Sequence, residues 1–271
     1  MRRLERSGGS ISEMFRFYMK KLLRCPATWV GGTVFFLSMV FGVAETLPHP
    51  DPMYLYDYAM NLGVSGFFLP VATVLPICFV RRELTRGSAW QFPLIHTAPL
   101  RYTGGGLVAA CLSGAIVSLI GFAAFFLFAV LTSREPLRLD TMQKWCIDLD
   151  YCPFWMKTPS LFFVFSLVIL IVRSMMFPAI AYAVSAYSSN QYLCAASPFV
   201  LFMLMVYGAQ RLGGEVNALF YYFDPSQLSC NGYCGMTTDG GMVFLFTYVG
   251  IVVILCGLLF WSKVSRRLRY G

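Results

Sequence analysis

The residues best suited to nucleophilic catalysis lie in the tetrapeptide Gly-Val-Ser-Gly at positions 63–66. A serine between glycines can attack a carbonyl when a histidine beside it acts as a general base. The chain has only two histidines, His49 and His96, and both fall in polar stretches outside the apolar runs. Ser65 therefore has no base within a membrane, and small residues at this spacing more often allow two helices to pack closely.

Two carboxylates, Asp148 and Asp150, stand close together in the stretch Asp-Leu-Asp-Tyr. Paired carboxylates can provide general acid and base groups, but no other cluster of acids or histidines accompanies this pair. A membrane enzyme acting on a lipid substrate is therefore kept as an alternative. A non-transporting scaffold or immunity protein, which simply binds its target, is the other alternative.

Four of the nine cysteines fall in segments expected outside the membrane: Cys146, Cys152, Cys230 and Cys234. Thiols oxidise more readily there, so we expect one or two disulfides, whose connectivity the spacing does not fix. Neither pair has the Cys-x-x-Cys spacing typical of zinc sites, and no metal site is expected. The other five cysteines lie in or near apolar runs, where a thiol acts as a small packing residue.

Arg173 is the one charged residue near the middle of an apolar run. A cation at the membrane midplane is costly and usually faces protein or a water-filled cavity. Two interpretations stay open. Arg173 lines a translocation path, paired with an acid such as Glu45, or it makes a structural contact with a backbone carbonyl.

The elements that must position these residues are transmembrane helices. Of the 271 residues, 58% are hydrophobic and only 13% are charged, about half the charged fraction of a soluble domain. Runs long enough to cross a bilayer occur at 29–46, 62–80, 105–131, 160–186, 193–210 and 242–262. We predict an all-α, multi-pass protein of the cell membrane with one transmembrane domain, residues 1–271.

The distribution of basic residues predicts how the chain is oriented. Residues 1–25, residues 81–102 and the C-terminal tail carry 15 of the 21 Lys and Arg. Six spans would place all three segments on one side, and the positive-inside rule makes that side the cytoplasm, with both termini inside. The net charge of +8 then matches anionic lipid headgroups rather than nucleic acid.

Three segments outside the spans carry further information. Residues 11–25 are amphipathic, which is typical of a helix lying in the headgroup plane, with an apolar face of Ile11, Met14, Phe15, Tyr18 and Leu22. Residues 132–159 and 211–241 are predicted extracytoplasmic loops. Residues 81–104 form a cytoplasmic segment in which Trp90 and Phe92 offer aromatic anchors for a partner protein.

The cytoplasmic segment also contains a loose motif. An acidic residue, a Gly-Ser pair and a proline before a basic residue follow one another as Glu83, Gly87, Ser88, Pro99 and Arg101. With the order of the elements, this motif resembles the permease subunits of type-2 ABC transporters. Members of that family have an amphipathic elbow helix, then six spans with both termini inside. Their segment between spans two and three docks on a separate ATPase subunit.

The resemblance implies a transport subunit and no catalytic residue on this chain. The implied ATPase-coupling residues are Glu83, Arg86, Gly87, Ser88, Trp90, Phe92, Pro99 and Arg101. It further implies a second permease copy, identical or a sister chain, and ATP-driven export of a drug, a peptide or a lipid-linked cargo. No Gly-Lys pair of a phosphate loop occurs in the chain, so ATP and Mg²⁺ are expected on the partner ATPase.

Overall fold

The computed structural model describes residues 11–47, 63–85, 99–133, 159–188, 190–211 and 238–270, together with Leu55 and Ala59. The elements in these residues are helical. They are α1 (Ile11–Arg24), α2 (Pro26–Val43), the short 3-10 helix η1 (Ala44–Thr46), α4 (Gly63–Thr85), α6 (Pro99–Thr132), α8 (Pro159–Val184), α9 (Gln191–Arg211) and α11 (Thr238–Tyr270).

Four helices in the described residues are long and apolar enough to cross a membrane. Their apolar stretches are Pro26–Thr46, Tyr102–Thr132, Leu167–Val184 and Val243–Arg266. Helices α4 and α9 contribute shorter apolar stretches, Phe67–Cys78 and Gln191–Tyr207. Helices satisfy all of their backbone hydrogen bonds internally, as a hydrocarbon environment requires. The chain is therefore an all-α membrane protein. That it crosses the membrane six times stays a prediction.

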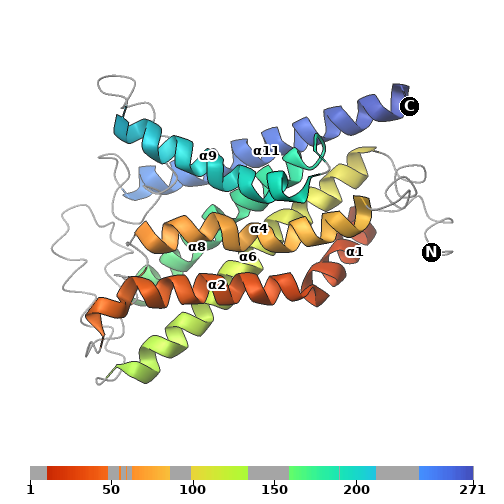
Figure 1. The fold of residues 1–271 in the computed structure, drawn as a ribbon. Coiled ribbons are helices and arrows are strands. Elements are labelled where there is room, and N and C mark those ends of the chain that lie inside the picture. The colour runs from red at the N-terminus through yellow and green to blue at the C-terminus, as the bar shows by residue number, and fades with distance from the viewer. Residues whose placement is uncertain are drawn as a thin grey trace.

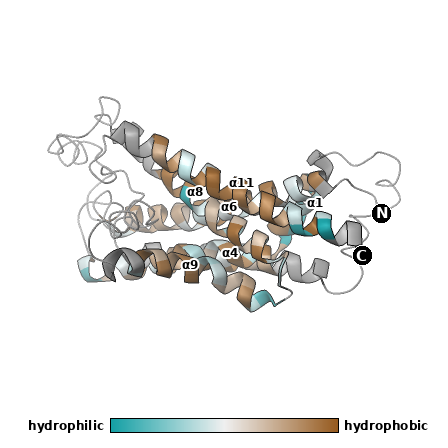
Figure 2. Cartoon of the chain, turned by 90° about the horizontal axis from the view of Figure 1, so that it is seen from above, coloured by the Kyte–Doolittle hydropathy of each residue, from teal (hydrophilic) through white to brown (hydrophobic). Residues whose placement is uncertain are grey.

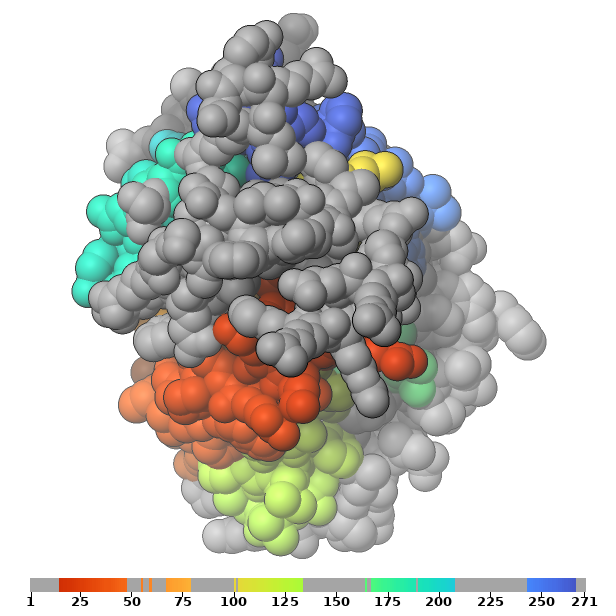
Figure 3. All heavy atoms as spheres, turned by 90° about the vertical axis from the view of Figure 1, so that its right-hand side faces the viewer, coloured from red at the N-terminus to blue at the C-terminus, as the bar shows by residue number. Residues whose placement is uncertain are grey.

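The long helices form a bundle in which successive helices run in opposite directions (Figure 1). Helix α1 and the C-terminal end of α11 lie at the same end of the bundle, on the right in Figure 1. Seen from that end, residues of α1 and α2 occupy one side and residues of α11 the other (Figure 3). Apolar residues dominate the middle of the helices, whereas α1 carries hydrophilic ones (Figure 2).

Small residues set the close approach of α2 to its neighbours. A Cβ atom on Gly31 would lie 2.5 Å from the backbone oxygen of Ala72 in α4, and one on Gly32 would lie 2.6 Å from Cγ2 of Ile120 in α6. Neither position has room for a side chain. The backbones therefore meet directly, which is how helices gain van der Waals contact where lipid removes the hydrophobic driving force.

Helices α6 and α8 meet in the same way around a polar contact. The Oγ atoms of Ser118 and Ser174 are buried and lie 3.0 Å apart. One turn away, a Cβ atom on Gly114 would meet the backbone oxygen of Ser174 and lie 2.9 Å from Cγ of Pro178. Helix α8 continues through Pro178 to Val184. Close packing against Gly114 gives this proline a buried position.

On either side of the predicted cytoplasmic segment, the helices extend beyond the predicted spans. Helix α4 continues from the predicted end at residue 80 to Thr85, and α6 begins at Pro99 rather than at residue 105. The predicted cytoplasmic segment 81–104 is therefore helical at both ends. The glycines at 104–106 lie inside α6 despite their poor helix propensity, and Gly106 packs closely against Tyr182 of α8.

Candidate functional site

The predicted ATPase-coupling residues lie mostly outside the described part of the chain. Nothing is described of Arg86, Gly87, Ser88, Trp90 and Phe92. For three others the structure gives the backbone only: Glu83 in the last turns of α4, and Pro99 and Arg101 in the first turn of α6. Their roles stay predictions. What the structure does describe is the set of helices on which this segment begins and ends.

Helix α1 occupies the residues predicted to be amphipathic. It packs against α6 at the end of the bundle where α11 also ends (Figure 1). Its Tyr18 and Leu22 side chains are 0% and 1% exposed, so its apolar face packs on protein. Arg24 is followed by Cys25, whose extended backbone turns the chain into α2 at Pro26. The Oγ1 atom of Thr28 donates a buried hydrogen bond of 2.6 Å to the Leu22 carbonyl oxygen, which fixes the corner between α1 and α2.

Four aromatic residues, here called the aromatic junction, connect α1 to three helices of the bundle: Tyr18, Tyr102, Tyr182 and Phe260. The ring centroids of Tyr18 and Tyr102 are 6.4 Å apart, and those of Tyr102 and Phe260 are 6.2 Å apart. Tyr182 stacks on Phe260 with centroids 4.1 Å apart. All four side chains are at most 3% exposed, so they form one continuous packed chain from α1 through α6 and α11 to α8.

The junction is held in place from α6. The hydroxyl of Tyr182 donates a 3.4 Å hydrogen bond to the carbonyl oxygen of Thr103. The Tyr182 ring lies against Gly106, where a Cβ atom would be 2.8 Å from Cζ. Only glycine leaves room for the ring at this point. Thr103 lies at the end of the predicted 81–104 segment and Gly106 follows it by two residues, so Tyr182 contacts α6 where that segment ends.

The aromatic junction is a buried packing contact between four helices. Packed aromatic rings transmit displacement because protein interiors are close-packed and compress little. The sequence indicated only that Tyr18 shares a face with other apolar residues. The partners on α6, α8 and α11 are 84 or more residues distant in sequence from Tyr18, and no local pattern signals them.

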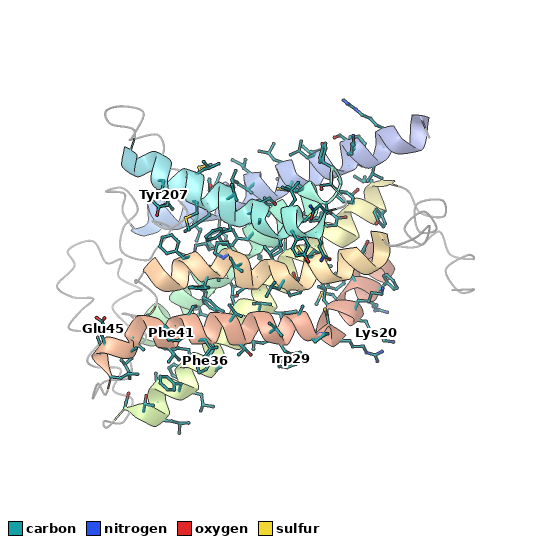
Figure 4. The ribbon with its side chains drawn as sticks, viewed as in Figure 1. Lys20, Trp29, Phe36, Phe41, Glu45 and Tyr207 are labelled. Atoms are coloured by element: carbon teal, nitrogen blue, oxygen red, sulfur yellow. The ribbon has the colours of Figure 1, made fainter. Side chains whose placement is uncertain are left out.

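The two residues predicted for a translocation path lie in different surroundings. Glu45 is exposed in η1, at the opposite end of the bundle from Lys20 (Figure 4). Arg173 is half-buried in α8, next to Ser174. The pairing of Arg173 with Glu45 stays a prediction.

The four cysteines predicted to form disulfides, Cys146, Cys152, Cys230 and Cys234, lie outside the described residues. The cysteines of the described helices are free thiols, and Cys78, Cys111, Cys194 and Cys256 are buried. Among the residues that the structure describes, no group of three or more His, Cys, Asp or Glu side chains could hold a metal ion.

Comparison with known proteins does not assign the chain to a family. No protein-family model, no curated protein and no solved structure matches it.

Proposed function

We propose that this protein is the membrane-spanning permease subunit of an ATP-driven exporter, with ATP hydrolysed by a separate subunit. The observation that carries the proposal is the contact between Tyr18 of α1 and Tyr102 at the start of α6. It places a basic amphipathic helix against the end of the 81–104 segment. An elbow helix coupled to a docking segment is the arrangement that the resemblance to type-2 ABC permeases implies.

The charge distribution supports an orientation with this end of the bundle in the cytoplasm. Basic residues of α1 and α11 gather there, and the described ones that are exposed are Arg16, Lys20, Arg24 and Arg266. At the opposite end the described charge includes Glu45. By the positive-inside rule the basic end faces the cytoplasm. In this proposal six helices cross the cell membrane, and both termini lie on its cytoplasmic side.

In this proposal the aromatic junction passes movement from the ATPase to the bundle. The ATPase binds the 81–104 segment, whose far end is continuous with α6. A shift of α6 displaces Tyr102 against Tyr18 and Thr103 against Tyr182. Helices α1, α8 and α11 then respond together, because the four rings share contacts.

The exporter works as a pair of permeases with two ATPase subunits, and ATP and Mg²⁺ bind to the ATPases. The second permease is an identical or a sister chain, and the cargo is a drug, a peptide or a lipid-linked molecule. Arg173, half-buried in α8, is the described residue best suited to face a polar path, because a midplane cation needs water or protein around it.

The experiment is a pull-down of the tagged protein in mild detergent, with ATPase activity assayed in the eluate. We expect an ATPase subunit to co-purify, and Trp90→Ala or Glu83→Ala to release it. Trp29→Ala is the matched control, because Trp29 is an exposed tryptophan of α2, 60% accessible and directed away from the bundle (Figure 4). It should leave the amount of ATPase unchanged.

A chain that inserts normally and elutes without an ATPase would contradict the transporter proposal. Hydrolytic activity on lipid substrates that is lost in Asp148→Asn and Asp150→Asn would instead favour the membrane enzyme. Capture of a non-ATPase target, without transport, would favour the scaffold or immunity protein.

A further inference from the structure

A lysine and a tyrosine form a fixed pair where the α8–α9 turn meets the end of α11. The ammonium nitrogen of Lys263 lies 5.4 Å from the ring centroid of Tyr187. A cation at this distance over an aromatic face is attracted by the ring. The pair is open to the surroundings, since Tyr187 is 52% exposed and Lys263 is partly exposed.

The Tyr187 ring is anchored rather than free to rotate. Its hydroxyl donates a 3.2 Å hydrogen bond to the carbonyl oxygen of Leu259, one turn before Lys263. The turn itself is tied by hydrogen bonds from the Tyr187 amide to the Val184 carbonyl oxygen and from the Asn190 amide to Ser188 Oγ. The ammonium group is therefore held at a defined place without losing its contact with solvent.

A second cation extends the pair. Arg266 is exposed and follows Lys263 by three residues on α11, so the two side chains lie on neighbouring parts of one helix face. Among the side chains that the structure describes, the acidic one is Glu45, which lies at the opposite end of the bundle (Figure 4). The two cations thus form a local excess of positive charge.

An apolar ridge leads from Lys263 towards the middle of the bundle. Residues four apart lie on one ridge of a helix, and here they are Ile251, Leu255 and Leu259, each 51–53% exposed. With a rise of 1.5 Å per residue the ridge from Ile251 to Lys263 is about 18 Å long. That length suits one acyl chain lying against α11 with its headgroup at Lys263.

We propose that Lys263, which Tyr187 positions, and Arg266 bind the phosphate of an anionic membrane lipid, with one acyl chain along the α11 ridge. Lysine offers a compact charge and arginine a planar fork that can hold two phosphate oxygens. A zwitterionic phospholipid has an ammonium group that cancels the charge of its phosphodiester, whereas an anionic phospholipid keeps a net negative charge. The two cations are therefore attracted more strongly to the anionic lipid. The site therefore prefers phosphatidylglycerol to phosphatidylcholine. This inference does not depend on the proposed export function.

The test is native mass spectrometry of the full-length protein in detergent, with equal amounts of phosphatidylglycerol and phosphatidylcholine added. We expect selective retention of phosphatidylglycerol. Each cation near an anionic headgroup contributes about 1 kcal/mol, so Lys263→Gln should lower the preference about fivefold and the Lys263→Gln, Arg266→Gln pair about 25-fold. Tyr187→Leu, which keeps both charges, should lower it by a smaller factor.

The matched control is the Lys20→Gln, Arg24→Gln pair on α1, which removes the same charge at the same end of the bundle. An equal loss of preference in this control would overturn the proposal, because the effect would then come from the overall charge. Binding of inorganic phosphate as tight as that of the lipid would also overturn it, since the ridge would have no role. So would a Lys263→Gln, Arg266→Gln double variant that keeps the full preference for phosphatidylglycerol.

Discussion

Two glycines of α6, only two residues apart, should respond in opposite ways to the same substitution. A Cβ atom at Gly104 meets nothing within 4 Å. At Gly106 it would lie 2.8 Å from Cζ and 2.9 Å from Cε2 of Tyr182. Tyr182 is 0% exposed and stacked on Phe260, so its ring has no free space to move into.

The magnitudes follow from two opposing effects. Replacing glycine by alanine inside a helix favours the helix by about 0.5–1 kcal/mol. Gly104→Ala should therefore raise the free energy of unfolding by up to about 1 kcal/mol. At Gly106 the added methyl group overpacks the contact with Tyr182, which costs about 1–3 kcal/mol. The two variants should thus differ by about 1–3 kcal/mol, because the helix-propensity gain is common to both.

The assay is unfolding of the purified protein in mixed micelles by increasing SDS, followed by far-UV circular dichroism. Tyr182→Phe removes the hydroxyl oxygen, the atom nearest to the added Cβ, and should restore part of the loss in the Gly106→Ala background. Coupling between the two changes is the signature of a direct contact. Equal stabilities for Gly104→Ala and Gly106→Ala, or fully additive effects of the Gly106→Ala and Tyr182→Phe changes, would refute the packing of α6 on α8.

Three further predictions concern other contacts. Tyr18→Ala removes a fully buried ring. Loss of more than about 1.4 kcal/mol of docking free energy should speed amide hydrogen exchange in α1 tenfold or more, while α6 stays protected. Unchanged exchange in α1 would contradict its docking. Ser174→Ala breaks the 3.0 Å contact with Ser118 and should lower the free energy of unfolding in SDS by about 0.6 kcal/mol. Ser118→Ala should cost less stability when Ser174 is already alanine than it does alone. Timed labelling with a hydrophilic maleimide, read by mass spectrometry, should modify half-buried Cys25 before the four buried thiols; simultaneous labelling would argue against their burial.

The amino-acid sequence by itself determined the class of the fold and the segments in which basic residues gather. Helices satisfy the backbone hydrogen bonds of long apolar runs in a membrane, and the length of an apolar run is a local property of the chain. The break between α1 and α2 at Cys25 and Pro26 is equally local, because proline restricts the residue before it. The clusters of basic residues in residues 11–25 and in the C-terminal tail are read directly from the sequence.

Only the tertiary structure decided which apolar residues meet. The sequence shows three consecutive glycines at 104–106, and only the neighbours of α6 separate the crowded Gly106 from the open Gly104. In the same way Tyr18 is one of several apolar residues on an amphipathic face until Tyr102 covers it. Contacts between helices depend on residues far apart in the chain, whereas helix formation depends on neighbours within a turn or two. That is why the helices could be predicted and the aromatic junction could not.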